Sequence, residues 1–106
     1  MYLCTMDQAT VNKIIASLKA KLDSTGLVVD SIAVFGSALH GEMTAGSDLD
    51  LIIISRDFEG KDIFERALMT MQAESALMKE FVIPMDILNL TPQEYKERKS
   101  MGLFDT

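Results

Sequence analysis

The fold is decided by residues 32–54, IAVFGSALHGEMTAGSDLDLIII. An apolar strand is followed by a Gly-Ser turn, a polar connection and a second strand that opens with two aspartates. Because successive side chains along a strand point to opposite faces, Asp48 and Asp50 lie on the same side of the sheet. The aliphatic run Leu51–Ile54 then buries the strand that carries them.

Two neighbouring carboxylates at the start of a buried strand need a compensating charge. They repel each other, and burying them without a partner would cost several kcal/mol. A divalent cation is the simplest compensation, and an all-oxygen ligand set favours a hard ion such as Mg²⁺. Gly36 lets the backbone approach a ligand, and the residues from Ser37 can offer free N–H groups to an anion. A phosphate-binding turn before a metal site indicates chemistry on a nucleotide.

The bulk composition restricts the classes of function. At 106 residues, we expect one domain over residues 1–106. The net charge of −6 argues against a free-standing nucleic-acid binder and favours a basic protein partner, or a small anion delivered with its metal. Cys4 is the single cysteine, and the chain has neither a membrane-length apolar run nor a signal-peptide pattern at its start. These features predict a cytoplasmic protein.

The flanking sequence predicts alternating helices and strands. The second strand is apolar on both faces beyond Asp50, which is typical of a central strand. The ten residues between Ser37 and Asp48 leave the relative direction of the first two strands open. The predicted elements are a helix from the capping box at Thr5–Gln8 to about Ser24, a strand Val28–Phe35, a strand Asp48–Ser55, a helix from Asp62 to about Glu80, a strand Phe81–Leu90 and a helix from Thr91 to about Met101.

A third acid, Asp86, interrupts the otherwise apolar third strand. Taken singly, each acid has an ordinary structural explanation: Asp48 as a turn residue, Asp50 as a strand-edge acid and Asp86 as a salt-bridge partner. Taken together they favour a shared metal site, because charged residues are almost never buried unpaired. His40, the only histidine, is either solvated or in contact with phosphate. The spacing of Gly41 and Gly46 does not make a P-loop, because the obligatory lysine is absent.

The arrangement resembles the signature of the DNA polymerase β-like nucleotidyltransferase superfamily. The resemblance rests on Gly36-Ser37, the ten residues that follow, Asp48-Leu49-Asp50, and a later single Asp86 on a strand. The short chain is similar to the minimal nucleotidyltransferase branch, whose members pair with helical HEPN proteins in toxin–antitoxin systems. The implied fold is an α/β (α+β) nucleotidyltransferase fold with a small mixed central sheet and helices packed mainly on one face.

The resemblance also implies roles for individual residues. Gly36, Ser37 and His40 would contact the triphosphate of ATP or another nucleoside triphosphate. Asp48, Asp50 and Asp86 would form the catalytic triad and hold two Mg²⁺ ions. The chain departs from the pattern at His40, where minimal members often carry arginine, and at Ala38, where a basic residue is common. Less positive charge would therefore face the phosphates.

The expected function is Mg²⁺-dependent transfer of a nucleoside monophosphate, AMP from ATP, to a hydroxyl of a partner protein, with the chain acting as an antitoxin on a HEPN toxin. One alternative is a catalytically weak or inactive antitoxin that neutralises its partner by contact alone. Another is a small-molecule nucleotidyltransferase, although no second domain remains to build an acceptor pocket.

Overall fold

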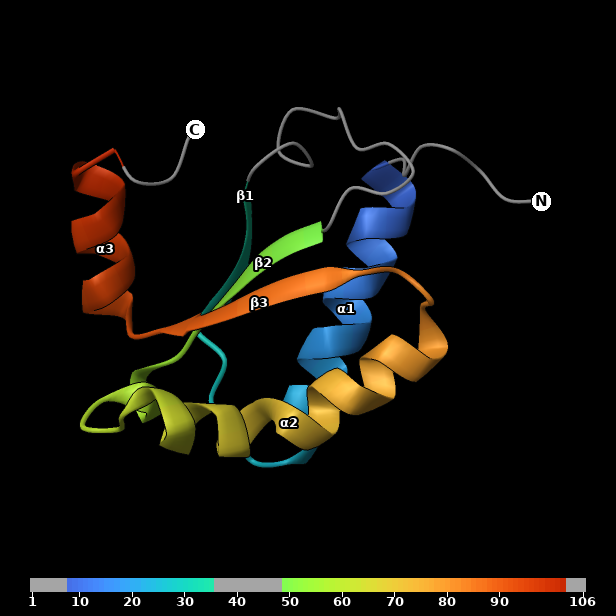
Figure 1. The fold of residues 1–106 in the computed structure, drawn as a ribbon, viewed down its shortest axis with the longest axis horizontal. Coiled ribbons are helices and arrows are strands. Elements are labelled where there is room, and N and C mark those ends of the chain that lie inside the picture. The colour runs from blue at the N-terminus through green and yellow to red at the C-terminus, as the bar shows by residue number, and fades with distance from the viewer. Residues whose placement is uncertain (1–7, 36–48, 103–106) are drawn as a thin grey trace.

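In the part of the chain that the structure describes, the fold consists of a three-stranded sheet and three α-helices (Figure 1). The structure is a computed structural model, and it describes residues 8–35 and 49–102. The assignment of residues 1–106 to a single domain stays a prediction. In chain order the elements are α1 (Gln8–Ser24), β1 (Ser31–Phe35), β2 (Leu49–Ile54), a 3₁₀ turn η2 (Arg56–Phe58), α2 (Ile63–Glu80), β3 (Met85–Leu90) and α3 (Pro92–Ser100).

The sheet is mixed, with β2 in the centre. Strand β1 pairs antiparallel with β2, and Phe35 is the Cα partner of Asp50. Strand β3 pairs parallel with β2 on the other side, and Asp50 is the partner of Asp86. The sequence left the strand directions open, and the family resemblance predicted a mixed sheet, which is confirmed. The central place of β2 also confirms what its two apolar faces predicted.

Alternate residues of β2 face two separate apolar clusters. One face carries Leu49, Leu51 and Ile53, which pack with the buried residues of α1 and α2. The opposite face carries Ile52 and Ile54, which pack with Leu90 and, from α3, Tyr95. Helices α1 and α2 therefore share one face of the sheet, while α3 lies at one end of it (Figure 1). The predicted small α+β fold with helices mainly on one face is confirmed.

Two strands begin later than predicted, at Ser31 rather than 28 and at Met85 rather than 81. Before β1, the Val28 N–H donates to the Asp57 carboxylate and the Val28 carbonyl accepts from the Ser55 hydroxyl. The backbone of Val28 therefore bonds to side chains and not to a neighbouring strand. Before β3, Pro84 has no N–H to give to a ladder, although its carbonyl accepts from Leu49 at 2.9 Å. Hydrogen bonds to side chains before β1, and the missing N–H of Pro84 before β3, thus explain the later starts of the two strands.

The helix starts follow the sequence closely. Asp62 and Glu65 form a reciprocal capping box at the start of α2. Thr91 and Glu94 form a second one at the start of α3, with proline at the first helical position. Each box satisfies two backbone N–H groups that a helix leaves without partners. Both predicted starts are confirmed. The predicted start of the first helix near Thr5 lies outside the described residues. Within residues 8–35 and 49–102, no helix is long and apolar enough to cross a bilayer.

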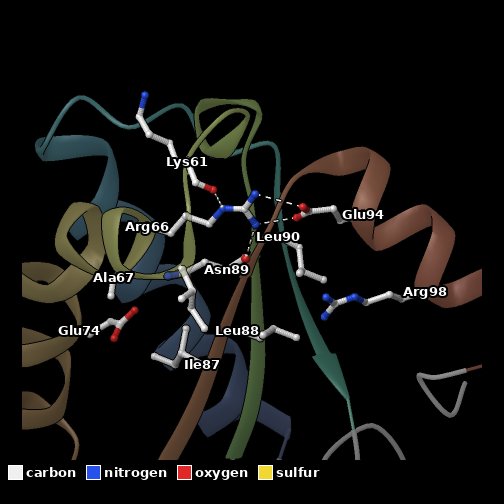
Figure 2. Close-up of a pocket in the computed structure, with 11 residues that line it drawn as sticks. Lys61, Arg66, Ala67, Glu74, Ile87, Leu88, Asn89, Leu90, Glu94 and Arg98 are labelled. Atoms are coloured by element: carbon white, nitrogen blue, oxygen red, sulfur yellow. Dashed lines mark hydrogen bonds and ion pairs between the residues drawn. The ribbon is translucent and has the colours of Figure 1, made fainter.

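Helix α3 buries no residue of its own and is held by an ion pair. The guanidinium of Arg66, on α2, contacts both carboxylate oxygens of Glu94, at 2.6 and 3.1 Å. It also donates to the carbonyls of Asn89 and Lys61, so one side chain joins α2, β3 and α3 (Figure 2). Hydrogen bonding from Arg66 lowers the pKa of Glu94 to about 2.

This ion pair predicts a loss of stability in acid. The folded pKa of Glu94 lies below its ordinary value of 4.5, so its contribution is complete above that value and is lost as the pH falls towards about 2. Glu94→Gln, which can keep the capping box, should lower the free energy of unfolding by about 1–2 kcal/mol at neutral pH, a value reduced for solvent screening. Urea denaturation between about pH 7 and 2 should show this difference shrinking as the pH falls.

Glu97→Gln is the matched control, because Glu97 lies on the same helix and its side chain makes only an exposed contact with Gln93. A Glu94→Gln difference that stays constant with pH, or a Glu97→Gln difference as large, would contradict the assigned role of the ion pair.

Candidate active site

The candidate site is the point where two aspartates meet on adjacent strands. Asp50 is the second residue of β2 and Asp86 the second of β3, and the parallel register makes them Cα partners. Adjacent strands lie about 4.8 Å apart, and partners in register point to the same face. The structure therefore brings together two of the three acids that the sequence singled out.

The carboxylates share the sheet face that α1 and α2 leave free. Leu49 and Leu51, which flank Asp50, are fully buried against those helices, so alternation places Asp50 on the opposite face. Asp50 is half-buried, and Asp86 is exposed. The next residues on this face, Ile52 and Leu88, belong to the smaller apolar cluster. The site is thus a polar, accessible end of an otherwise apolar surface.

The other predicted site residues, Gly36, Ser37, His40 and Asp48, lie outside the described residues. Their covalent neighbours are nevertheless placed. Phe35, directly before Gly36, is the partner of Asp50 across β1 and β2. Leu49, directly after Asp48, begins β2. The chain therefore enters and leaves the 36–48 segment beside the two aspartates.

The two described carboxylates fit a divalent metal ion. Like charges on neighbouring strands destabilise the pair, and a hard cation between carboxylate oxygens reverses the sign of that interaction. Within residues 8–35 and 49–102, no group of three potential ligands is assembled. A triad therefore requires a ligand from the remaining residues, and the sequence predicts Asp48.

The family comparison identifies the class of protein. The nucleotidyltransferase domain family matches the chain over residues 11–105. The chain belongs to this family. Nucleotidyltransferases move a nucleotidyl group from a nucleoside triphosphate and generally use a divalent metal ion, so the chain is assigned to the transferases. The prediction that the chain is a nucleotidyltransferase is confirmed, whereas the minimal branch and the HEPN pairing stay predictions.

Solved structures support the fold. The chain is similar to a candidate nucleotidyltransferase from Sulfolobus solfataricus, with 19% identity over 87% of this chain and 82% of that one and a TM-score of 0.52. It is also similar to BolA1 from Arabidopsis thaliana, with 18% identity over 76% of this chain and 94% of that one and a TM-score of 0.53. At such identities these likenesses concern the fold alone. No curated protein matches the chain.

A cavity of about 380 Å³ lies beside β3, between α2 and α3, and its lining includes Ile87–Leu90 (Figure 2). Its lining includes Glu74, which accepts a hydrogen bond from Thr70 at 2.7 Å and whose pKa is raised by burial. Asn89 donates to Thr70, while its own Oδ1 has no partner among the described residues. Sequence patterns missed this cluster, because the only signal was one threonine within the buried stripe of α2.

Replacing Asp86 tests the paired-carboxylate site. Without metal, Asp86→Asn should leave the free energy of unfolding unchanged or raise it by up to about 1 kcal/mol, because a like-charge pair is removed. With millimolar Mg²⁺ or Mn²⁺, the wild-type protein should gain thermal stability and the variant should gain less. Glu59→Gln, an exposed change of equal charge beyond β2, is the control. Equal metal-dependent shifts in all three proteins would contradict the site.

Proposed function

We propose that this nucleotidyltransferase transfers AMP from ATP to a hydroxyl group of a partner protein, and that the partner is a HEPN-type helical toxin which the modification silences. The observation that carries the proposal is the in-register pair of Asp50 and Asp86 on the sheet face opposite α1 and α2. It supplies acidic ligands where the family's triad would lie, at the start of two neighbouring strands.

Asp48, Asp50 and Asp86 would hold Mg²⁺, which when bound offsets the charge of the triphosphate and of the leaving group. Gly36 and Ser37 would orient the phosphates through backbone N–H groups, with His40 adding positive charge when protonated. The acceptor hydroxyl oxygen forms a bond to the α-phosphorus as the bond from that phosphorus to the bridging oxygen breaks. Asp86 takes the hydroxyl proton, and pyrophosphate leaves.

A protein acceptor fits the shape and charge of the molecule. Asp86 is exposed on the sheet face opposite α1 and α2, where a protruding side chain can reach it without a deep pocket. The net charge of −6 favours a basic partner surface. Modification of a tyrosine near the toxin's own active site would add negative charge and bulk where RNA enters, and so block the toxin.

Intact-mass measurement tests the transfer. The chain, a HEPN-type protein, ATP and Mg²⁺ are mixed, and the HEPN-type protein should gain one or more adenylyl groups with wild type and with Glu59→Gln. Asp86→Asn should reduce the rate by at least about 100-fold, because loss of a metal or general-base ligand removes transition-state stabilisation.

Labelled ATP separates the possible outcomes. Label in the α-phosphate should remain on the acceptor, whereas label in the γ-phosphate should leave with pyrophosphate. A toxin that is fully inhibited without any change in mass would overturn the transfer and identify a contact-only antitoxin. Adenylylation that is unaffected by Asp86→Asn would overturn the assigned site.

A further inference from the structure

Helix α2 carries an apolar stripe that none of the described residues covers. Phe64 and Leu68 are 77% and 69% exposed, and Met71, Met78 and Val82 are also exposed. The stripe is defined here as Phe64, Leu68, Met71, Ser75, Met78 and Val82, the last just beyond the helix end. Its members within the helix are separated by four, three, four and three residues, the spacing of a coiled-coil seam, and Val82 follows the extended C-cap residue Phe81.

The stripe lies opposite the face by which α2 joins the core. Thr70, Ala73 and Leu77 are the buried residues of α2, and they face α1 and the sheet. At 100° per residue, Met71 and Ser75 lie on the far side of the helix from Ala73. In Figure 1 the sheet and α3 lie above α2. A contiguous exposed apolar surface of this kind marks an interaction site.

The charges beside the stripe identify its occupant. Glu65 and Lys79 are both exposed, lie two heptads apart and flank the same side of the stripe. A second α2 packed antiparallel would place Glu65 of each copy beside Lys79 of the other, forming two opposite-charge contacts. A parallel copy would instead place Glu65 level with Glu65 and Lys79 level with Lys79, so neither charge would meet its opposite. The flanking charges are therefore self-complementary in one orientation only.

We propose that the stripe is the interface of a two-fold homodimer in which α2 packs antiparallel against α2 of a second copy. In this register Leu68 lies opposite Met78 of the second copy, and Phe64 lies towards the C-terminal end of the second copy's α2. Gln72 meets Gln72 of the second copy beside the two-fold axis, where two amides can hydrogen-bond. From Phe64 to Met78 the seam extends over about 21 Å of helix.

The centre of the stripe suits a close approach of two helices. Ser75 is its one polar member, and it is small, uncharged and exposed. In the antiparallel register Ser75 lies opposite Met71 of the second copy, so a short side chain meets a long and adaptable one. Packing two stripes together therefore buries no charge, and the cost of desolvating an unpaired ion does not arise.

A second copy fits better than an unrelated basic protein. The net charge of −6 opposes self-association in general, but Glu65 and Lys79 give one edge of the stripe both signs of charge. On the other edge, Glu74 is half-buried and turned towards Thr70, which reduces its repulsion across the axis. A uniformly basic surface would attract Glu65 but repel Lys79, whereas a second copy satisfies both.

Sedimentation of the full chain tests the dimer. We expect wild type to form a dimer at micromolar concentrations, and Leu68→Glu to be a monomer with unchanged far-UV circular dichroism. Val28→Glu is the matched control, because Val28 is another exposed aliphatic residue and is not part of the stripe. A monomeric wild type at about 100 μM, or a dimer that survives Leu68→Glu, would overturn the proposal.

Charge reversal tests the antiparallel orientation. Lys79→Glu should raise the dimer Kd about ten-fold, since it turns two attractive contacts into repulsive ones. Adding Glu65→Gln, which can keep the helix cap, should restore most of the affinity. Lys13→Glu, on the exposed face of α1, gives the same net charge and should have little effect. Equal weakening by Lys79→Glu and Lys13→Glu, or no recovery in the double variant, would overturn the orientation.

Discussion

The burial of β2 on both faces is the constraint on which the rest of the structure depends. Leu51 and Ile53 pack against α1 and α2, while Ile52 and Ile54 pack with Leu90 on the opposite face. A strand enclosed in this way must lie between two others, and its charged residue must lie where the enclosure ends. The position of Asp50 at the start of β2 therefore follows from the packing of the residues after it.

The same packing places Asp86. Parallel pairing with β2 aligns Leu88 with Ile52 and Leu90 with Ile54, so the apolar residues of the two strands meet in one cluster. A shift of one residue would turn the side chains of β3 to the wrong face. The register that satisfies the hydrophobic cluster is thus also the register that aligns the two carboxylates, and stability and site geometry share one cause.

Much of this could be predicted from local sequence, because the signals are local. Capping residues defined the starts of α2 and α3, and the aliphatic run after Asp50 defined the central strand. The direction of β1 relative to β2 could not be predicted, because residues 36–48, which connect the two strands, carry no sequence pattern that fixes it. The Arg66–Glu94 contact joins residues far apart in the chain, so Glu94 could be identified only as a helix cap. Asp48, Gly36, Ser37 and His40 remain predictions.

The way α3 is attached has a consequence for local unfolding. Helix α3 contributes no buried residue; it contacts the sheet through Tyr95, while Arg66 holds its first turn. Elements with few buried apolar contacts open at a lower free energy than the core. Opening of α3 would uncover Leu90 and the apolar face of β2 without disturbing the α1–α2 side. The amide hydrogens of α3 should therefore exchange with solvent ahead of those in β2, which makes α3 a separate, less stable cooperative unit.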